Sequence, residues 1–527
     1  SQRRARDGCG AGPAPSSEVP MPSSPLVIAV DSSTTSTKAI IVDDAGQVLA
    51  QHRCDLEMHT PRVHCYEQDP RDWWHSTDRA IAGAVAALSG ADRARVSHLC
   101  VTAQRQTFAL VTDTGEPLRP AILWLDGRAE EQVRRLGTEE IHALSGFQPD
   151  LTPSLYKLAW LADHEPETLR RADRVVGVHG YLVHELTGRW ADSVATADSL
   201  GLLDMAANTY SDHLVALAGL RPGQLAELAP AGSVIDTVRP EITRAWGLPG
   251  QVDLVAACGD GQAAALGVGA IEMDEAYLNL GTALVAGVHS PQYRYAGAFR
   301  TDAAGIPGQY VLEIVQNSGA YLAGWFRTEL GDPRLAGRPD PELEEAAAQV
   351  SPGCGGLVTL PYWNAVQSPH WDPTALGAVV GLAGAYGRAE MYRSVLEGLS
   401  IEMAGNLSSL QAATRVPLTS IRVVGGGQRS VLWRQIMTDA VGLPLTDCAQ
   451  DEVSAMGAAV LAMAAAGAHP SIAHAARAMA HLGASSEPDP QAHELYRELG
   501  EIQAGLYPAL RDTFARQRQF AADHPMR

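Results

Sequence analysis

Short apolar runs that end in small or polar residues alternate along this chain with longer segments of helical periodicity. Residues 26–30 and 39–42 are apolar runs of strand length on either side of a polar turn. Residues 276–280 and 284–288 are largely apolar and flank a second turn of small residues. Bounded runs of this length predict buried strands. We therefore expect two hairpins of related construction, one early in the chain and one near its middle.

Helical periodicity follows these hairpins in both halves of the chain. We predict helices over residues 69–87, 155–164, 389–406 and 430–441. Strands that alternate with helices predict an α/β fold, here with two halves of related architecture on either side of a ligand cleft. The boundary between the halves is expected near residues 267–274.

This pattern divides the chain into four parts. Residues 1–24 are rich in Arg, Gly, Pro and Ser and lack the apolar core of a signal peptide, so we expect a disordered extension there. An N-terminal domain is expected over 25–268, a C-terminal domain over 269–510 and a tail over 511–527. The most apolar stretch, 455–468, is shorter than the roughly 20 residues that cross a membrane, and it predicts a buried helix.

The composition narrows the choice of partners. With 527 residues, 46% of them hydrophobic, the chain can bury two large cores, and its 50 glycines suit an α/β protein with many tight turns. The formal charge of −20 repels nucleic acid and anionic membranes at long range, so we expect neither as a partner. Seven cysteines without a CxxC spacing indicate the thiols of a reducing compartment, and we expect the cytoplasm.

The turn between the first two strands carries the most distinctive chemistry. It reads Asp31, then Ser and Thr at every position of 32–37, then Lys38, and lysine occurs elsewhere in the chain only at Lys157. Backbone amides, hydroxyls and a lysine can hold phosphates, and a carboxylate at a strand end can hold Mg²⁺ directly or through water. The same residues also suit an ordinary polar turn, because Ser, Thr and Asp form local hydrogen bonds.

Three later segments suit related chemistry. The turn at Gly281 and Thr282 repeats the first hairpin without its acid, and two such turns can clamp a polyphosphate from both sides. The acid Asp260 ends an apolar strand and opens a helix, where it can accept a proton from an attacking hydroxyl or serve as a helix cap. The glycines 425–427 join a strand to a helix, and such bare backbone can lie against a flat ring or a sugar, or simply form a tight connection.

Taken together, these segments resemble the FGGY carbohydrate kinases, members of the actin-like ATPase superfamily, over about residues 25–510. The matching motifs are the first phosphate turn, a YEQDP-x-x-WW block, a substrate-side block, the two family signatures and an adenosine motif of the xylulose-kinase form. They lie at residues 31–38, 66–74, 104–107, 118–128, 154–164, 377–397 and 425–435.

The resemblance implies two ribonuclease-H-like domains and ATP-dependent phosphorylation of a sugar or polyol hydroxyl. It makes Asp260 the catalytic base and assigns Mg²⁺ to Asp31. The residues implied to line the substrate pocket with the base are Arg105, Gln106, Trp124 and Thr152, of which Trp124 also suits core packing. Those implied to contact the phosphates and the adenosine are Thr34, Thr35, Lys38, Gly281, Thr282, Gly425, Gly426 and Ser430.

Three departures from the family patterns bear on the substrate. Where xylulose kinases usually carry Gln-Met-His-Gly, residues 104–107 read Gln-Arg-Gln-Thr, which leans toward the glycerol-kinase form Gln-Arg-Glu-Thr. Thr152 stands where a glycerol kinase would place an aromatic residue, and Gly261 stands beside the base where bulkier polar residues are common. We expect a ketopentose such as D-xylulose as the substrate, with other pentuloses, tetritols and glycerol left open.

Two other functional classes fit part of this pattern. An actin-like ATPase would share the phosphate clamp without acting on a sugar, and the substrate-side block argues against it. A binding protein with an inactive site would have lost chemical groups, whereas Asp31, Lys38 and Asp260 are all present. The expected partners are therefore a small sugar or polyol and ATP, and a homodimer is left open.

Overall fold

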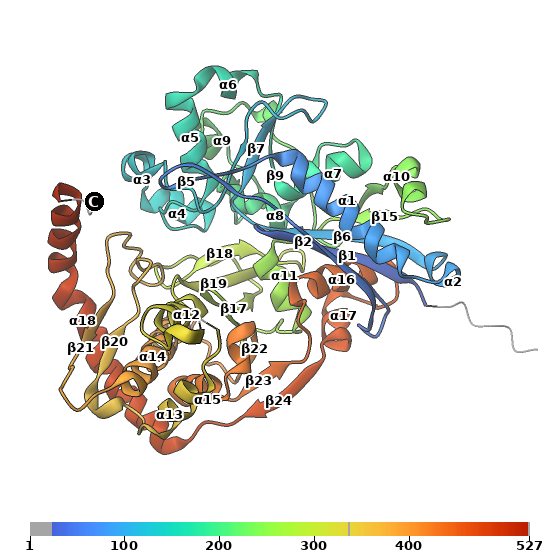
Figure 1. Ribbon diagram of the computed structural model, residues 1–527. Helices are drawn as coiled ribbons and strands as arrows, with labels where there is room; N and C mark the ends of the chain where they lie inside the picture. The colour runs from blue at the N-terminus through green and yellow to red at the C-terminus, as the bar shows by residue number, and fades with distance from the viewer. Residues whose placement is uncertain (1–23, 336–337, 525–527) are drawn as a thin grey trace, which may run out of the picture.

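Two lobes, each built on a mixed β-sheet, make up the computed structural model, which describes residues 24–335 and 338–524 (Figure 1). The N-terminal sheet has the strand order β14 (Val234–Thr237), β15 (Asp253–Val255), β6 (Val96–Ala103), β1 (Leu26–Ser32), β2 (Ser36–Val42) and β3 (Val48–Asp55). The C-terminal sheet has the order β18 (Arg300–Ala303), β19 (Tyr310–Gln316), β17 (Leu284–Ser290), β16 (Glu275–Leu280), β22 (Ser420–Val424), β23 (Leu445–Cys448) and β24 (Leu482–Ser486). Apart from Ser24, the extension predicted over 1–24 lies outside the described residues.

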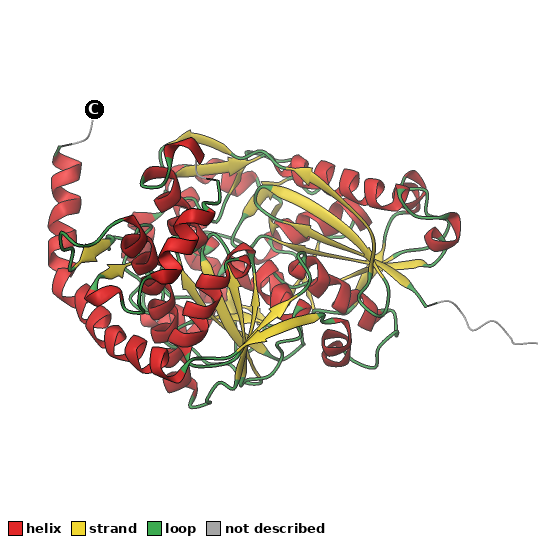
Figure 2. Ribbon diagram, turned by 60° about the horizontal axis from the view of Figure 1, so that its bottom comes forward, coloured by secondary structure: helices red, strands yellow, loops and turns green. Residues whose placement is uncertain are grey.

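Helices flank both sheets, and a smaller sheet extends the N-terminal lobe (Figure 2). The small sheet has the order β4 (His59–Arg62), β5 (Cys65–Gln68), β8 (Ala121–Ile122), β7 (Phe108–Val111) and β9 (Arg174–Gly177). The helices that bear on the site are α1 (Pro70–Ala86), α5 (Ser154–His164), α7 (Val178–Thr187), α11 (Asp260–Gly267), α12 (Ala320–Glu329), α13 (Pro341–Gln349), α14 (Arg388–Thr414), α15 (Val431–Val441), α16 (Val453–Ala465) and α18 (Pro490–Asp523).

The predicted hairpins and helices are present. The pairs β1 with β2 and β16 with β17 are antiparallel hairpins, and they contain the four apolar runs. Helices α1, α5 and α15 match their predicted ranges to within a residue at either end. Helix α14 runs on to Thr414, well beyond the predicted end, and α18 continues as helix through Asp523 in the segment expected as a tail.

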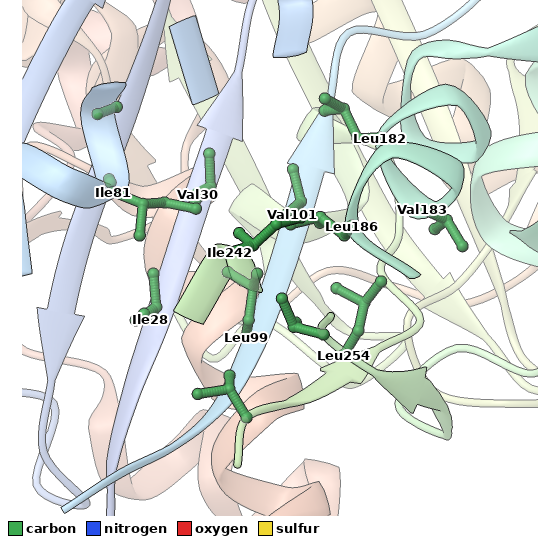
Figure 3. Packing of buried hydrophobic residues seen from close by; sticks show 14 of the residues in the cluster. Ile28, Val30, Ile81, Leu99, Val101, Leu182, Val183, Leu186, Ile242 and Leu254 are labelled. Carbon is green, nitrogen blue, oxygen red and sulfur yellow. The ribbon is translucent and has the colours of Figure 1, made fainter. Parts of the chain in front are cut away.

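Strand β1 is apolar from Leu26 to Val30 because helices cover both faces of its sheet there. Ile28 and Val30 lie in a core with residues of α1 and α7 (Figure 3). Val27 and Ala29 lie in a second core with residues of α11 and α16. Successive side chains of a strand point to opposite faces, so a strand covered on both sides needs an apolar residue at every position.

Helix α16 is the buried helix that the apolar stretch 455–468 predicts. Every residue from Ala455 to Met463 is buried. The helix lies between β23 and β24 of the C-terminal sheet in sequence, yet it packs on β1, β6 and α11 of the N-terminal lobe and thereby joins the lobes. No helix within the described ranges is long and apolar enough to cross a membrane.

The crossing of α11 and α16 is so close that glycines are required on both helices. An ideal Cβ on Gly457 would lie 1.9 Å from the carbonyl oxygen of Ala263, and one on Gly267 would lie 2.1 Å from that of Val453. These neighbours are backbone atoms of packed helices and cannot turn aside. The contact therefore fixes the start of α11, where Asp260 stands, against the C-terminal part of the chain.

We predict that Gly457→Ala destabilises the protein by roughly 1–3 kcal/mol or more, because the added methyl group overlaps the backbone of α11. Gly405→Ala is the matched control, since Gly405 is exposed in α14 and an added Cβ would meet nothing within 4 Å. Alanine favours a helix over glycine by up to about 1 kcal/mol, so the control should melt no earlier than wild type. Thermal unfolding followed by circular dichroism measures both, and identical melting temperatures for the two variants would contradict the packing.

Candidate active site

One edge of the N-terminal sheet collects three of the predicted site residues. Strands β1, β6 and β15 are parallel, with Asp31 opposite Thr102 on β6 and Val255 opposite Cys100. Arg105 lies just after the end of β6. Asp260 follows β15 and is the first residue of α11. Because the carboxyl ends of parallel strands meet at one edge, the topology itself brings Asp31, Arg105 and Asp260 together.

Arg105 lies at the centre of an ion network that spans both lobes. Its Nε is 3.1 Å from Oδ1 of Asp260, its Nη1 is 3.1 Å from Oδ1 of Asp302, and its Nη2 is 3.0 Å from Oε1 of Glu313. The Arg105 side chain is 10% exposed, and those of Asp302 and Glu313 are fully buried on β18 and β19. Burial alone would lower the pKa of Arg105, but the carboxylates of Glu313, Asp302 and Asp260 raise it well above its ordinary value.

Glu313 is itself held by several donors. Arg300 pairs with it, and the Tyr277 hydroxyl donates to its Oε2 at 2.6 Å. Burial alone would raise the pKa of Glu313, but Arg105, Arg300 and the Tyr277 hydrogen bond lower it to about 2. Burial raises the pKa of Asp302 to about 6 against the opposing charges of Arg105 and Arg300. The network thus joins the guanidinium groups of Arg105 and Arg300 to the acidic side chains of Asp260, Asp302 and Glu313.

Two glycines beside Asp260 make room for this network. A Cβ on Gly259 would lie 2.5 Å from Cδ of Arg105. A Cβ on Gly261 would lie 2.6 Å from Oε2 of Glu313 and 2.7 Å from Nη2 of Arg105. Gly261, one of the three departures from the family pattern, is therefore explained by the guanidinium and carboxylate that occupy its side-chain space.

Trp124 and Thr34 connect the substrate-side block to the first phosphate turn. The Trp124 indole donates to the Thr34 hydroxyl at 3.0 Å, and that hydroxyl donates to Gln104 at 3.2 Å. Gln68, from the YEQDP block, donates to the Thr34 carbonyl at 2.7 Å, and Trp73 donates to Gln68. The Thr34 hydroxyl thus lies between Trp124 and Gln104, and the phosphate contact that the resemblance implies for Thr34 stays a prediction.

The two remaining residues of the predicted pocket differ in exposure. Gln106 is buried and has a φ of 62°, a strained conformation for a residue other than glycine, and its backbone NH donates to the Ser199 hydroxyl. Thr152 is half-buried and donates to Oδ2 of Asp150 at 3.2 Å. Asp150 also accepts from Gln367 of the C-terminal lobe at 2.6 Å, a further contact between the lobes.

Asp31 and Lys38 face each other across the first hairpin and meet a residue that the sequence did not single out. Both oxygens of Glu452, which directly precedes α16, accept from Nζ of Lys38 at 2.7 and 2.8 Å. Oδ1 of Asp31 is buried and has no hydrogen-bond partner among the described residues. Burial raises the pKa of Asp31 to about 7, aided by the charges of Asp260 and Glu452 and opposed by Lys38.

These groups fit a magnesium ion that is bound together with phosphate. The described ranges contain no group of three or more His, Cys, Asp or Glu residues that could enclose a metal. Mg²⁺ commonly takes one or two carboxylates and completes its octahedron with water and substrate phosphates. The orphaned buried oxygen of Asp31 suits one such ligand position.

The second phosphate turn and the adenosine motif lie at one edge of the C-terminal sheet. Strands β16 and β22 are parallel, with Asn279 opposite Val424, so Gly281 and Gly425 follow neighbouring strands. Gly425 has a φ of +90°, and a Cβ there would lie 2.4 Å from Oδ1 of Asn279, so both its conformation and its space require glycine. The carbonyls of Gly281 and Thr282 accept from the first amides of α12.

The other residues predicted on the nucleotide side differ in exposure and in hydrogen bonding. Thr35, Thr282 and Gly426 are exposed, and their surroundings leave them accessible to a ligand. Ser430 is the N-cap of α15, accepts from the amide of Trp433 at 3.0 Å and donates to Glu344 of α13. Direct contacts thus join Arg105 to Asp260 and Trp124 to Thr34 in the N-terminal lobe. In the C-terminal lobe, the pairing of β16 with β22 places Gly281 near Gly425 and Gly426.

Several charged residues near the site were not predicted from the sequence. Glu313 is a charged residue inside the largely apolar strand β19, which was the available signal, since buried charges require partners. Strand β18, which carries Arg300 and Asp302, is short and polar and gave no such signal. Glu452 opens the apolar helix α16, and nothing local indicated that it would meet Lys38 across the chain.

Two family models match most of this chain. They are the FGGY family of carbohydrate kinases, N-terminal domain, over residues 26–267, and the C-terminal domain of the same family over residues 276–466. A xylulose kinase of Escherichia coli (strain K12) is 31% identical over 92% of this chain and 99% of its own length. A gluconokinase of Bacillus subtilis (strain 168) is 26% identical over 84% of this chain and 88% of its own length.

A glycerol kinase and a solved structure are also similar to this chain. A glycerol kinase of Bordetella parapertussis is 30% identical over 85% of this chain and 90% of its own length. A crystal structure of a xylulose kinase from Rhodospirillum rubrum has a TM-score of 0.85 to this chain at 28% identity, covering 93% of this chain and all of that one. The two-lobed architecture is therefore shared over nearly the whole length.

We predict that Glu313→Gln lowers the free energy of unfolding by roughly 3–5 kcal/mol at neutral pH, because two buried guanidinium groups lose their carboxylate. The folded-state pKa of Glu313 lies below its ordinary value of 4.5, so its stabilising contribution is present above pH 4.5 and declines as the pH falls toward about 2. The difference from wild type should therefore be smaller at about pH 3 than at about pH 7.

Denaturant unfolding at both pH values measures this difference. Glu345→Gln is the control, because Glu345 is exposed on α13, and it should change stability little at either pH. A Glu313→Gln protein as stable as wild type at neutral pH, or a deficit that does not change with pH, would contradict the role assigned to the carboxylate.

Proposed function

Because the chain belongs to the FGGY family of carbohydrate kinases, and is thus a phosphotransferase with an alcohol group as acceptor, we propose that it phosphorylates a neutral ketopentose, preferentially D-xylulose, with ATP as donor. The observation that carries this proposal is the Arg105 network, which places a guanidinium against Asp260 within a cluster of carboxylates. The xylulose kinase relative supports the choice of sugar, while the glycerol kinase relative keeps glycerol as the second candidate.

The charge of the pocket supports a neutral substrate. Two guanidinium groups, Arg105 and Arg300, face the three carboxylates of Asp260, Asp302 and Glu313, and each guanidinium is already paired. A sugar acid such as gluconate would bring a further carboxylate toward this set without an unpaired cation to receive it. Hydroxyl groups can instead donate to the carboxylates and accept from the guanidinium, so a polyol or ketose satisfies both.

Asp260 is oriented to accept a proton. Both hydrogen bonds that described residues donate to its carboxylate, from Nε of Arg105 at 3.1 Å and from the Gly261 amide at 2.8 Å, end on Oδ1. Oδ2 therefore points away from these donors, and the side chain is 36% exposed. A sugar hydroxyl that donates to Oδ2 would be positioned as a nucleophile with its base already in place.

Phosphoryl transfer can then proceed with the groups of both lobes. The sugar oxygen forms a bond to the γ-phosphorus, the bond from that phosphorus to the bridging oxygen of ADP breaks, and the hydroxyl proton passes to Asp260. Lys38 and Thr35 would face the phosphates from one lobe, and Gly281 and Thr282 from the other. Mg²⁺, held through Asp31, would neutralise charge on the phosphates. Gly425, Gly426 and Ser430 would lie against the adenosine.

The residue at position 152 supports a five-carbon sugar over glycerol. Thr152 is small and half-buried where the resemblance places an aromatic ring in glycerol kinases, so it would leave more room for a longer chain. Arg105, Gln106 and Trp124 supply polar groups and one flat face around that space. Tetritols and other pentuloses share the hydroxyl pattern and remain alternatives, as does a protein that binds the sugar without turnover.

We predict at least about a tenfold preference in kcat/KM for D-xylulose over glycerol, because the longer substrate gains contacts that glycerol cannot make, and 1.4 kcal/mol already gives that factor. Gluconate should be at least about tenfold poorer than the best neutral sugar. A coupled ADP-release assay over D-xylulose, other pentuloses, erythritol, glycerol and gluconate measures this order. Glycerol as the best substrate would refute the ketopentose assignment, and gluconate as the best would refute the charge argument.

We also predict that Asp260→Asn lowers turnover by about 10²-fold or more while nucleotide affinity is retained, because the amide keeps the shape of the side chain but cannot accept the proton. Asp55→Asn is the control, since the Asp55 side chain is 83% exposed, and it should be as active as wild type. Single-turnover kinetics and nucleotide titration separate the two effects. Near-normal turnover in folded Asp260→Asn would mean that another group serves as the base.

A further inference from the structure

Lys157 is a buried amine that the proposed chemistry does not use. It lies on α5, its side chain is fully buried, and it is one of two lysines in the chain. Its Nζ donates to the backbone carbonyls of Leu123 at 3.2 Å, Trp124 at 3.1 Å and Thr152 at 2.9 Å. An ammonium group has three N–H donors and no acceptor, so three carbonyls satisfy it completely.

The carbonyls belong to two segments that line the proposed sugar pocket. One segment carries Trp124, whose indole donates to Thr34 and whose backbone amide donates to the Thr107 hydroxyl at 3.1 Å. The other carries Thr152, which is linked through Asp150 to Gln367 of the C-terminal lobe. Thr152 lies just before α5, and the Lys157 ammonium on that helix bridges it to the segment that carries Leu123 and Trp124.

We propose that Lys157 is a positioning residue that holds the Trp124 and Thr152 segments at the separation that the sugar pocket requires. The inference rests on the proposed function, since these segments matter to catalysis only if they line a sugar site. It goes beyond the roles assigned to Arg105 and Asp260, because Lys157 would act on the sugar through two backbone segments and touch neither substrate nor nucleotide.

Protonation should control this bridge within the neutral range. Burial lowers the pKa of Lys157 to about 7, with Arg128 lowering it further and Asp126 and Asp150 opposing the fall. A neutral amine has two donors and a lone pair, so one of the three carbonyls would lose its donor and face the lone pair. As the pH rises through about 7, the two segments should loosen and the sugar should bind less well.

The charge of Lys157 can be measured directly because the chain contains two lysines. Selective ¹⁵N labelling of lysine gives one Nζ signal for Lys38 and one for Lys157, and the Lys157→Met protein identifies the second. We expect the Lys157 signal to titrate near pH 7. Titration near the ordinary lysine value of about 10 would contradict the switch. This measurement needs no substrate, so it does not depend on the proposed function.

Kinetics of two variants test the positioning role. Lys157→Met keeps the length of the side chain and removes its donors, and it should raise KM for the best neutral sugar by about tenfold with KM for ATP changed less than about twofold. Lys157→Arg keeps a permanent charge with a planar fork that does not match the three carbonyls, so it should also raise the sugar KM. The ratio of wild-type to Lys157→Met kcat/KM should fall from about pH 6 to about pH 9.

Arg135→Met is the control, because Arg135 is half-exposed and its ion pair with Asp163 lies on the surface of the same lobe. Equal sugar KM values for wild type and Lys157→Met would overturn the inference while leaving the kinase assignment intact. A wild type that phosphorylates no neutral sugar would overturn both. If Lys157→Met does not fold, Lys157→Arg and the pH profile of the wild type test the positioning role instead. A wild-type sugar KM that is constant from about pH 6 to about pH 9 would overturn that role.

Discussion

The buried guanidinium of Arg105 is the interaction on which the rest of this structure depends. It contacts one carboxylate of its own lobe, Asp260, and two of the other, Asp302 and Glu313. Burying the two carboxylates of Asp302 and Glu313 is costly unless each meets a cation in good geometry. Gly259 and Gly261, on either side of Asp260, leave room for the Arg105 side chain, because a Cβ at either position would overlap it.

This constraint ties the proposed chemistry to the arrangement of the two lobes. Glu313 orients Arg105, Arg105 orients Oδ1 of Asp260, and the close crossing of α11 and α16 fixes the start of the helix that carries Asp260. A shift of the C-terminal sheet is therefore transmitted to the base. On the nucleotide side Lys38 is paired with Glu452 across the chain, so phosphate and carboxylate would compete for the same amine.

Local sequence pattern was sufficient to predict much of the fold. It could not predict which residues pair over long distances in the chain. The apolar runs around Asp31 and Gly281 predicted β1, β2, β16 and β17, because a strand covered on both faces needs an unbroken run. The resemblance named Asp260 and Arg105, but their partners on β18 and β19 lie far along the chain, and no local pattern specifies which acid a guanidinium will meet. The contact of the Thr34 hydroxyl with Trp124 was not predicted, since turn chemistry does not determine the direction of a side chain.

The most direct test of this account is a crystal structure of the protein with D-xylulose, Mg²⁺ and a non-hydrolysable ATP analogue. The account predicts a sugar hydroxyl within about 3.2 Å of Oδ2 of Asp260, with Arg105 still on Oδ1. It also predicts the γ-phosphate between the turn that follows Asp31 and the turn at Gly281. A sugar bound away from Asp260, or an analogue whose phosphates meet one lobe and not the other, would contradict it.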